Sequence, residues 1–216
     1  MAVKSLHIVF IKPSKYDDDG YVIRFKSGIL PSNTLHVLNG LTHDIKERKA
    51  LGLIEITTSA FDETVQFIPV GHIIAASKKS DTMTIICLVG VQTNQFPRAM
   101  DLARQFRSAN LPVLMGGFHT SGTINMLSDQ EPEIQEMVKQ GITVISGEVE
   151  EKWEHILASA LDHKLEPIYS FAQDLKNLPD ISKSPFPMIH PDTMKHYTLS
   201  NMATIDTSRG CPFSCS

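Results

Sequence analysis

The chain has 216 residues, of which 42% are hydrophobic and 20% charged, and its formal net charge is -4. This composition is typical of a soluble folded protein. It offers no basic surface for nucleic acid, and it lacks an apolar run near the roughly 18 residues that a membrane span needs. Because the three cysteines are too few for a disulfide framework and the N-terminal apolar run lacks a cleavage site, we expect a cytoplasmic protein.

Short apolar runs rich in β-branched residues predict buried strands at residues 6–11, 53–59, 82–91, 111–117 and 142–147. Helical spacing of apolar residues predicts helices at residues 34–52, 97–110, 131–141 and 150–164. Thr34 is a candidate N-cap and Gly52 a candidate stop for the first helix, and Pro97 suits a first helical position. The run at residues 72–77 fits a short strand or a short helix.

Strands that alternate with helices at this spacing predict an α/β fold. We expect a doubly wound parallel sheet of five strands, Rossmann-like or flavodoxin-like, within residues 1–165. Ligands of such sheets bind beyond the carboxyl ends of the strands. The loops after the first, third, fourth and fifth strands are therefore the places to look for a site.

The composition changes after about residue 165. Periodicity weakens there and prolines become frequent, at Pro167, Pro179, Pro185, Pro187 and Pro191. This pattern predicts a connector over residues 166–202 that lies across a surface. A further strand at residues 203–207 leads into a cysteine-bearing loop, so residues 203–216 are expected to begin another domain.

The fourth predicted strand ends in MGGFHTSG, residues 115–122. Gly116 and Gly117 would let a ligand approach the backbone closely, and His119 is a candidate ligand or general base. A tight turn carrying a histidine without a chemical role explains the same residues.

The loop after the third strand carries four neutral hydrogen-bonding side chains, Gln92, Thr93, Asn94 and Gln95. They suit the rim of a site for a polar, uncharged ligand edge such as a row of amides. The alternative is a polar loop that supplies the N-cap of the next helix.

After the fifth strand, Gly147 permits a sharp turn. Three acidic residues follow it and are expected in the first turn of the last helix, at Glu148, Glu150 and Glu151. Acidic groups there would stabilise the helix dipole, which accounts for most of this stretch without a ligand.

Several common sites are absent from the sequence. It contains neither GxGxxG nor GxxxxGK[ST], so nicotinamide and nucleoside-triphosphate binding lose their main support. The acidic run before Gly20 predicts a hairpin turn, because it lacks the alternating ligands of a calcium loop. Cys87 lies inside an apolar strand and is expected in the core.

Cys211 and Cys215 stand at CxxxC spacing, which suits part of a zinc site, a disulfide or an iron–sulfur site. Their context, a strand followed by SRGCPFSC, resembles the radical S-adenosylmethionine enzymes. The signature of that family is CxxxCxxC after the first strand of a TIM-like barrel. Its third cysteine would come three residues after Cys215, past the end of the sequence, so we expect a chain truncated within the motif.

The upstream region resembles the cobalamin-dependent branch of that family, in which a B12-binding domain and a connector precede the barrel. The GG-x-H element of such domains matches Gly116, Gly117 and His119. The GE-x-E element matches Gly147, Glu148 and Glu150. The DxHxxG motif that supplies a lower axial histidine is missing after the first strand. The resemblance therefore implies either cobalamin bound without that ligand or a domain that has lost cobalamin.

The resemblance implies three cofactors. Cobalamin would bind at the loops of residues 92–95, 116–119 and 147–148, while Cys211 and Cys215 would bind a [4Fe–4S] cluster that S-adenosylmethionine chelates. The full-length family performs radical-based methyl transfer or a related rearrangement. Without the barrel, as part of the same chain or as a split partner, this chain is not expected to catalyse that reaction. The alternatives are a non-catalytic flavodoxin-like binding module that has lost cobalamin, and a zinc-binding regulatory protein.

Overall fold

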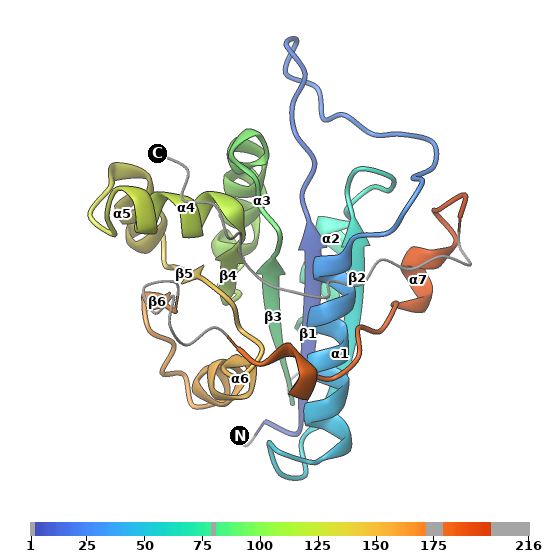
Figure 1. Ribbon diagram of the computed structural model, residues 1–216, viewed down its shortest axis with the longest axis vertical. Helices are drawn as coiled ribbons and strands as arrows, with labels where there is room; N and C mark the ends of the chain where they lie inside the picture. Colours follow the sequence, from blue (N-terminus) through green and yellow to red (C-terminus); the bar gives the residue numbers. More distant parts are fainter. Residues whose placement is uncertain (1–2, 79–80, 172–178, 200–216) are drawn as a thin grey trace.

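The computed structural model describes residues 3–78, 81–171 and 179–199. These residues form one parallel sheet with strand order β2-β1-β3-β4-β5-β6 (Figure 1). The strands are β1 Ser5–Lys12, β2 Glu55–Asp62, β3 Thr82–Leu88, β4 Val113–Gly116, β5 Ile142–Ser146 and β6 Ile168–Ser170. The α-helices are α1 Asn33–Glu47, α2 Val70–Ala76, α3 Phe96–Ser108, α4 Phe118–Met126, α5 Pro132–Lys139, α6 Trp153–Leu161 and α7 Pro191–Met194.

The predicted doubly wound α/β fold is confirmed, but the predicted number of strands is wrong. The sheet has six strands, because β6 pairs in parallel with β5 from within the proline-rich stretch. The three residues of β6 are too few to produce a periodic pattern in the sequence. Tyr169, at its centre, is only 4% exposed and fixes this strand in the core.

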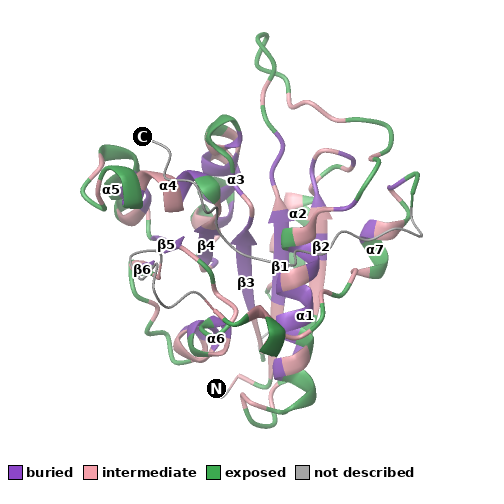
Figure 2. Cartoon of the chain, in the orientation of Figure 1, coloured by how far each residue is buried: buried purple, intermediate pink, exposed green. Residues whose placement is uncertain are grey.

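Helices cover both faces of the sheet. α1 and α6 pack on one face, with Phe10 and Trp153 in their shared core, and α3 and α5 pack on the other, around Val9 and Ile11. Successive residues of β1 thus point to opposite faces, and both faces are apolar because both are covered. Figure 2 shows the resulting burial of the strands. Cys87 is 2% exposed in the first of these cores, as expected.

The helix ends differ in part from expectation. α1 begins at Asn33 with Ser32 as its N-cap residue, two positions before the expected cap Thr34, and it ends at Glu47 rather than at Gly52. The run at residues 72–77, for which the sequence allowed a short strand or a short helix, belongs mostly to the helix α2. Pro97 does lie in the first turn of α3, and Gly141 follows α5 with φ of 73°.

None of the helices in the described ranges has both the length and the apolarity that a bilayer span requires.

Candidate functional site

The strand order changes direction at β1, whose neighbours are β2 and β3. The helix after β1 covers one face of the sheet and the helix after β3 covers the other. Loops that leave in opposite directions open a crevice beyond the carboxyl ends of such strands, which is where parallel sheets bind ligands. The loop between β1 and α1, residues 13–32, rises above this end of the sheet, and α4 lies at the same end (Figure 1). We call this end the carboxyl edge.

Of the four polar residues predicted to border a ligand after β3, three are exposed to solvent. Gln92, Thr93 and Asn94 are exposed. Gln95 is 8% exposed and turns inward, where its Oε1 accepts a hydrogen bond from the backbone N of Gln92 at 3.0 Å. Gln92 and Gln95 form a reciprocal capping box at the turn into α3, because the side chain of Gln92 in turn accepts from the backbone N of Gln95. The side chains of Thr93 and Asn94, together with the amide NH₂ of Gln92, face solvent and can contact a ligand.

The exit of β4 is shorter than predicted, because α4 already begins at Phe118. Gly117 alone makes the turn, with φ of 147°. A Cβ atom there would lie 2.2 Å from the backbone N of Val91. The backbone N of Val91 also donates to the carbonyl of Gly116 at 3.2 Å. Gly117 therefore lets the exits of β3 and β4 pack directly on each other, while a Cβ at Gly116 would meet only ordinary contacts of 3.4 Å.

His119 lies in the first turn of α4 rather than in a loop, and it is 5% exposed. Its ring stacks on Phe96 with a centroid separation of 4.1 Å, and its Nε2 lies 3.2 Å from Oε2 of Glu133. Burial lowers the pKa of His119, and the carboxylate of Glu133 only partly opposes this shift. The side chain therefore joins α4 to α3 and α5 as a neutral imidazole at pH 7.

A second histidine, His36 of α1, is buried to 1% exposure, and neither of its ring nitrogens has a hydrogen-bond partner among the described residues. Burial lowers its pKa as well. Below the ordinary histidine pKa of about 6.5 the unfolded chain binds protons at both sites more readily than the native protein does. Stability contributed by the neutral rings is therefore lost as the pH falls below that value.

We expect the free energy of unfolding, measured with urea at pH 7.5, 6.5 and 5.5, to decrease toward acid. His36→Gln and His119→Gln should each reduce that decrease, because each removes one buried group that resists protonation. An unchanged pH dependence in both variants would contradict the assignment of neutral rings.

The exit of β5 combines a flexible backbone position with an unpaired hydroxyl. Gly147 has φ of 94°, and its backbone N donates to Oγ of Ser121 at 3.0 Å. Ser146 is fully buried, and its Oγ has no hydrogen-bond partner among the described residues. A buried hydroxyl without a partner is costly, and it is commonly explained by a ligand or an ordered water.

The sequence predicted that the glutamates after β5 lie in the first turn of the last helix. This prediction is wrong, because α6 begins only at Trp153. The carbonyl of Val149 accepts from the backbone N of both Lys152 and Trp153, which makes a separate turn ahead of the helix. Glu148 is exposed. Its carboxylate therefore lies ahead of the helix, next to Gly147 at the carboxyl edge.

Exposed aromatic side chains follow three of the strands at this edge. Phe25 follows β1, Phe67 follows β2 and Phe118 follows β4, with exposures of 62%, 77% and 75%. The β1–α1 loop adds Ile29 at 70% exposure. These side chains offer apolar surface to a ligand or another domain at the carboxyl edge, although Leu53 and Phe186 are still more exposed elsewhere.

A buried charge cluster fixes the base of the β1–α1 loop. Glu63, which follows β2, is fully buried, and its Oε1 lies 2.6 Å from Nη2 of Arg98 and 3.3 Å from Nη2 of Arg24. Its Oε2 also accepts from the backbone N of Ser14 at 3.2 Å. Burial opposes the charge of Arg98, but the hydrogen bonds to Glu63 and Tyr16, together with the charge of Glu63, outweigh it and raise the pKa of Arg98.

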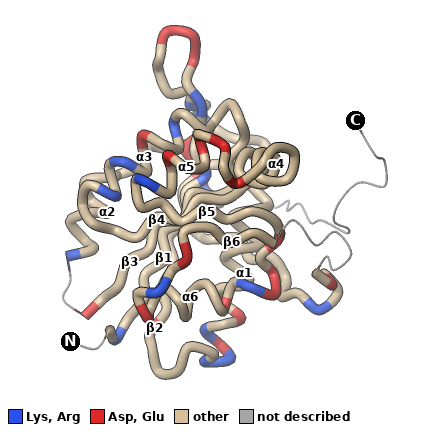
Figure 3. Tube along the Cα trace, turned by 90° about the vertical axis from the view of Figure 1, so that its left-hand side faces the viewer, with Lys and Arg blue, Asp and Glu red and all other residues tan. Residues whose placement is uncertain are grey.

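Sequence reasoning did not find this cluster, since its members come from the β1–α1 loop, the end of β2 and α3. Nothing in their spacing signals that they meet. The loop itself projects from the carboxyl edge with an acidic tip (Figure 3), formed by Asp17, Asp18 and Asp19. The expected turn at Gly20 is present, with φ of 85°.

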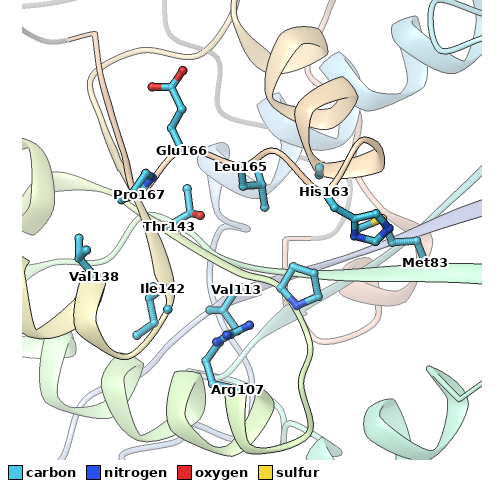
Figure 4. Close-up of a pocket in the computed structure, with 13 residues that line it drawn as sticks. Met83, Arg107, Val113, Val138, Ile142, Thr143, His163, Leu165, Glu166 and Pro167 are labelled. Atoms are coloured by element: carbon cyan, nitrogen blue, oxygen red, sulfur yellow. The ribbon is translucent and has the colours of Figure 1, made fainter.

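A pocket of about 310 Å³ lies at the opposite end of the sheet, at the amino ends of β3, β4 and β5 (Figure 4). Met83, Val113 and Ile142 contribute apolar walls. Its arginine, Arg107, donates to the carbonyls of Gln140 and Leu111 at 3.2 and 2.8 Å. The guanidinium group therefore forms hydrogen bonds with backbone carbonyls near the ends of α3 and α5, and it stabilises the fold.

Within the described ranges, no group of three or more His, Cys, Asp or Glu side chains is placed to bind a metal ion. The predicted metal ligands Cys211 and Cys215 lie outside these ranges. The predicted strand at residues 203–207 does so as well.

Comparisons of this chain with protein-family models, with curated proteins and with solved structures found no match.

Proposed function

We propose that the carboxyl edge binds cobalamin, and that the chain is the cobalamin-binding region of a radical S-adenosylmethionine enzyme. The observation that carries the proposal is the position of Gln92, Thr93 and Asn94, three exposed uncharged hydrogen-bonding residues, at the exit of β3. This exit borders the point where the strand order changes direction, and ligands of parallel sheets bind at such points.

The residues at this edge suit the chemistry of the cofactor. A corrin carries neutral amide side chains around an apolar ring, so its partners should be uncharged polar groups and apolar surfaces. Gln92, Thr93 and Asn94 supply the first kind, and the exposed rings of Phe25 and Phe118 supply the second. Bound cobalamin supplies a methyl group carrier, and the protein's part is to hold it and exclude water.

The exit of β5 supports a ligand at the same edge. Oγ of Ser146 is buried without a partner, and the positive φ of Gly147 leaves the backbone free of a side chain there. We assign these two residues to direct contact with the cofactor. Gly117 and His119 have contacts within the protein, and we assign them to holding the exits of β3 and β4 in place.

We further propose that cobalamin binds here without a lower histidine from the β1 exit. That loop begins with Pro13, Ser14 and Lys15, none of which is an imidazole. Cys211 and Cys215 are assigned, on the resemblance alone, to a [4Fe–4S] cluster that S-adenosylmethionine chelates. Substrate turnover then needs the radical S-adenosylmethionine barrel as a partner.

Purified protein mixed with hydroxocobalamin should keep a corrin absorption spectrum, at one cobalamin per chain, after desalting. Asn94→Ala should raise the dissociation constant of cobalamin roughly fivefold, as expected for one lost hydrogen bond of about 1 kcal/mol. Gln105→Ala is a matched control, because Gln105 is an exposed amide near the far end of α3.

A colourless protein after desalting would overturn the proposal and favour the binding module without cobalamin. Equal affinities for Asn94→Ala and Gln105→Ala would remove the β3 exit from the site.

A further inference from the structure

A segment far along the chain, residues 186–198, lies against α1 and β2, and we call it the docked segment. Gly40 of α1 permits the contact, since a Cβ atom there would collide with the carbonyl O of Phe186. The backbone N of Met188 donates to the carbonyl of His36 at 2.9 Å, and Nδ2 of Asn39 donates to the carbonyl of Met188 at 3.1 Å. The docked segment therefore packs as part of this domain.

Further along, the docked segment follows the outer edge of β2. Nε2 of His190 lies 3.1 Å from the carbonyl O of Thr58, and α7 packs beside β2 (Figure 1). An edge strand exposes unpaired backbone groups, and a segment that covers them protects the sheet from pairing with other chains. This path carries the chain toward the carboxyl edge.

Tyr197 lies near the end of the docked segment, in a buried position. Its hydroxyl donates to Oδ2 of Asp62 at 2.6 Å, and that same oxygen lies 3.2 Å from Nζ of Lys12. Tyr197 is 6% exposed and Asp62 is 1% exposed. Burial, followed by the nearby carboxylate, raises the pKa of Tyr197, so the phenol stays protonated and donates at every physiological pH.

The backbone on both sides of Tyr197 pairs with the β1–α1 loop. The N of Gly28 donates to the carbonyl of His196 at 3.0 Å, and the N of Thr198 donates to the carbonyl of Gly28 at 2.8 Å. The ring of Tyr197 covers Gly28 so closely that a Cβ atom there would collide with it. Oγ of Ser27 also donates to the carbonyl of His196 at 3.1 Å.

The β1–α1 loop is thus held from two directions. Its first half is fixed to Glu63 through Ser14 and Arg24, and the N of Phe25 donates to the carbonyl of Thr64 at 2.7 Å. Its second half, residues 26–32, meets the docked segment at Gly28. The exposed side chain of Ile29 follows directly after that contact.

We propose that Tyr197 is a positioning residue that holds residues 26–32 of the β1–α1 loop in place at the carboxyl edge. The claim about cobalamin rests on the proposed function: with the loop held, its apolar side chains form one wall of the cobalamin site. If the Tyr197 contact and bound cobalamin both stabilise the same loop conformation, each increases the stability of the other by the same free energy. Cobalamin should therefore protect the docked segment, and loss of the Tyr197 contact should weaken cobalamin binding.

The test is hydrogen exchange of the whole chain, followed by mass spectrometry, with Tyr197→Phe as the first variant. Peptides within residues 26–32 should exchange about tenfold faster than in the wild type, because a hydrogen bond to a buried carboxylate is lost. Peptides from β1 and β3 should keep their wild-type exchange, which separates local release from general unfolding. The dissociation constant of cobalamin should rise at least about fivefold.

Tyr169→Phe is the matched control. Tyr169 belongs to β6, the edge strand on the opposite side of the sheet from β2. It is 4% exposed, and its hydroxyl accepts a hydrogen bond from the backbone N of Glu166. The control variant should leave residues 26–32 and cobalamin affinity unchanged. Gly28→Ala is the second variant, and it should release the same peptides by displacing the ring of Tyr197.

Wild-type exchange of residues 26–32 in both Tyr197→Phe and Gly28→Ala would overturn the proposal. Released peptides with unchanged cobalamin affinity would overturn the coupling to the ligand. A wild-type chain that binds no cobalamin overturns the proposed function instead, and exchange in the ligand-free variants then decides the role of Tyr197 by itself.

Discussion

Gly117→Ala is expected to destabilise the protein by about 3 kcal/mol or more. The backbone at Gly117 has φ of 147° and ψ of -167°, a region that is essentially restricted to glycine and costs another residue about 1–3 kcal/mol. The added Cβ would lie 2.2 Å from the N of Val91 and 2.7 Å from the carbonyl carbon of Gly90. Both are backbone atoms of the β3 exit, so no side-chain rotation relieves the collision, and overpacking adds about 1–3 kcal/mol.

Urea unfolding at pH 7.5 measures the effect, and the same helix and strand exit supply two controls. Gly116→Ala should change stability little, because its Cβ would meet Ile145 at an ordinary 3.4 Å. Gly122→Ala should stabilise the protein by up to about 1 kcal/mol, since Gly122 lies within α4 with open space around its Cβ position. Wild-type stability in Gly117→Ala would show that the two strand exits do not pack as described.

This prediction also bears on how the GG-x-H element is interpreted. If Gly117 serves the packing of the protein on itself, loss of cobalamin binding in Gly117→Ala reflects a damaged fold. Gly116→Ala is then the variant that reports on contact between this turn and the cofactor. The pair should differ in thermal stability before any ligand is added.

Glu63→Gln is expected to destabilise the protein by about 3–5 kcal/mol, the range for breaking a buried ion pair by removing one partner. The carboxylate is fully buried, and the side chains of Arg98 and Arg24 are only 14% and 24% exposed. An amide keeps the shape but removes the charge, and it turns an NH₂ group toward these cations. Urea unfolding at pH 7.5 again measures the loss.

Asp44→Asn provides the comparison at the surface. Asp44 pairs with Arg48 on α1 at 2.7 Å, with side-chain exposures of 33% and 52%, and such exposed pairs contribute at most about 0.5 kcal/mol. Equal effects for the two variants would contradict the burial of the Glu63 cluster. Glu63→Gln should also loosen the β1–α1 loop, because Ser14 and Arg24 belong to that loop.

The sequence alone determined the fold class and the positions of five strands. Most of those strands are short runs rich in apolar residues, and a run buried on both faces, such as β5, keeps its signal without any knowledge of its neighbours. The sixth strand, Ile168–Ser170, was missed because its stability comes from pairing with β5 and not from its own three residues. The start of α6 at Trp153 was missed for a similar reason, because turn hydrogen bonds to the carbonyl of Val149 decide it.

For the candidate site, the sequence indicated the loops but not the direction of their side chains. It named Gln92 to Gln95 together, and the structure shows that a capping box at the turn into α3 turns Gln95 inward while the other three residues are exposed. It placed His119 in a loop, and the early start of α4 buried that ring between Phe96 and Glu133.

The contacts that hold the carboxyl edge together depend on the tertiary structure entirely. Asp62 meets Tyr197 although 135 positions separate them, and Glu63 meets Arg98 across 35. Local patterns report which residues are buried and how often they recur along the chain, but they carry no information on which buried charge faces which. The sequence therefore determined that a doubly wound sheet forms, and tertiary packing decided how its carboxyl edge is built.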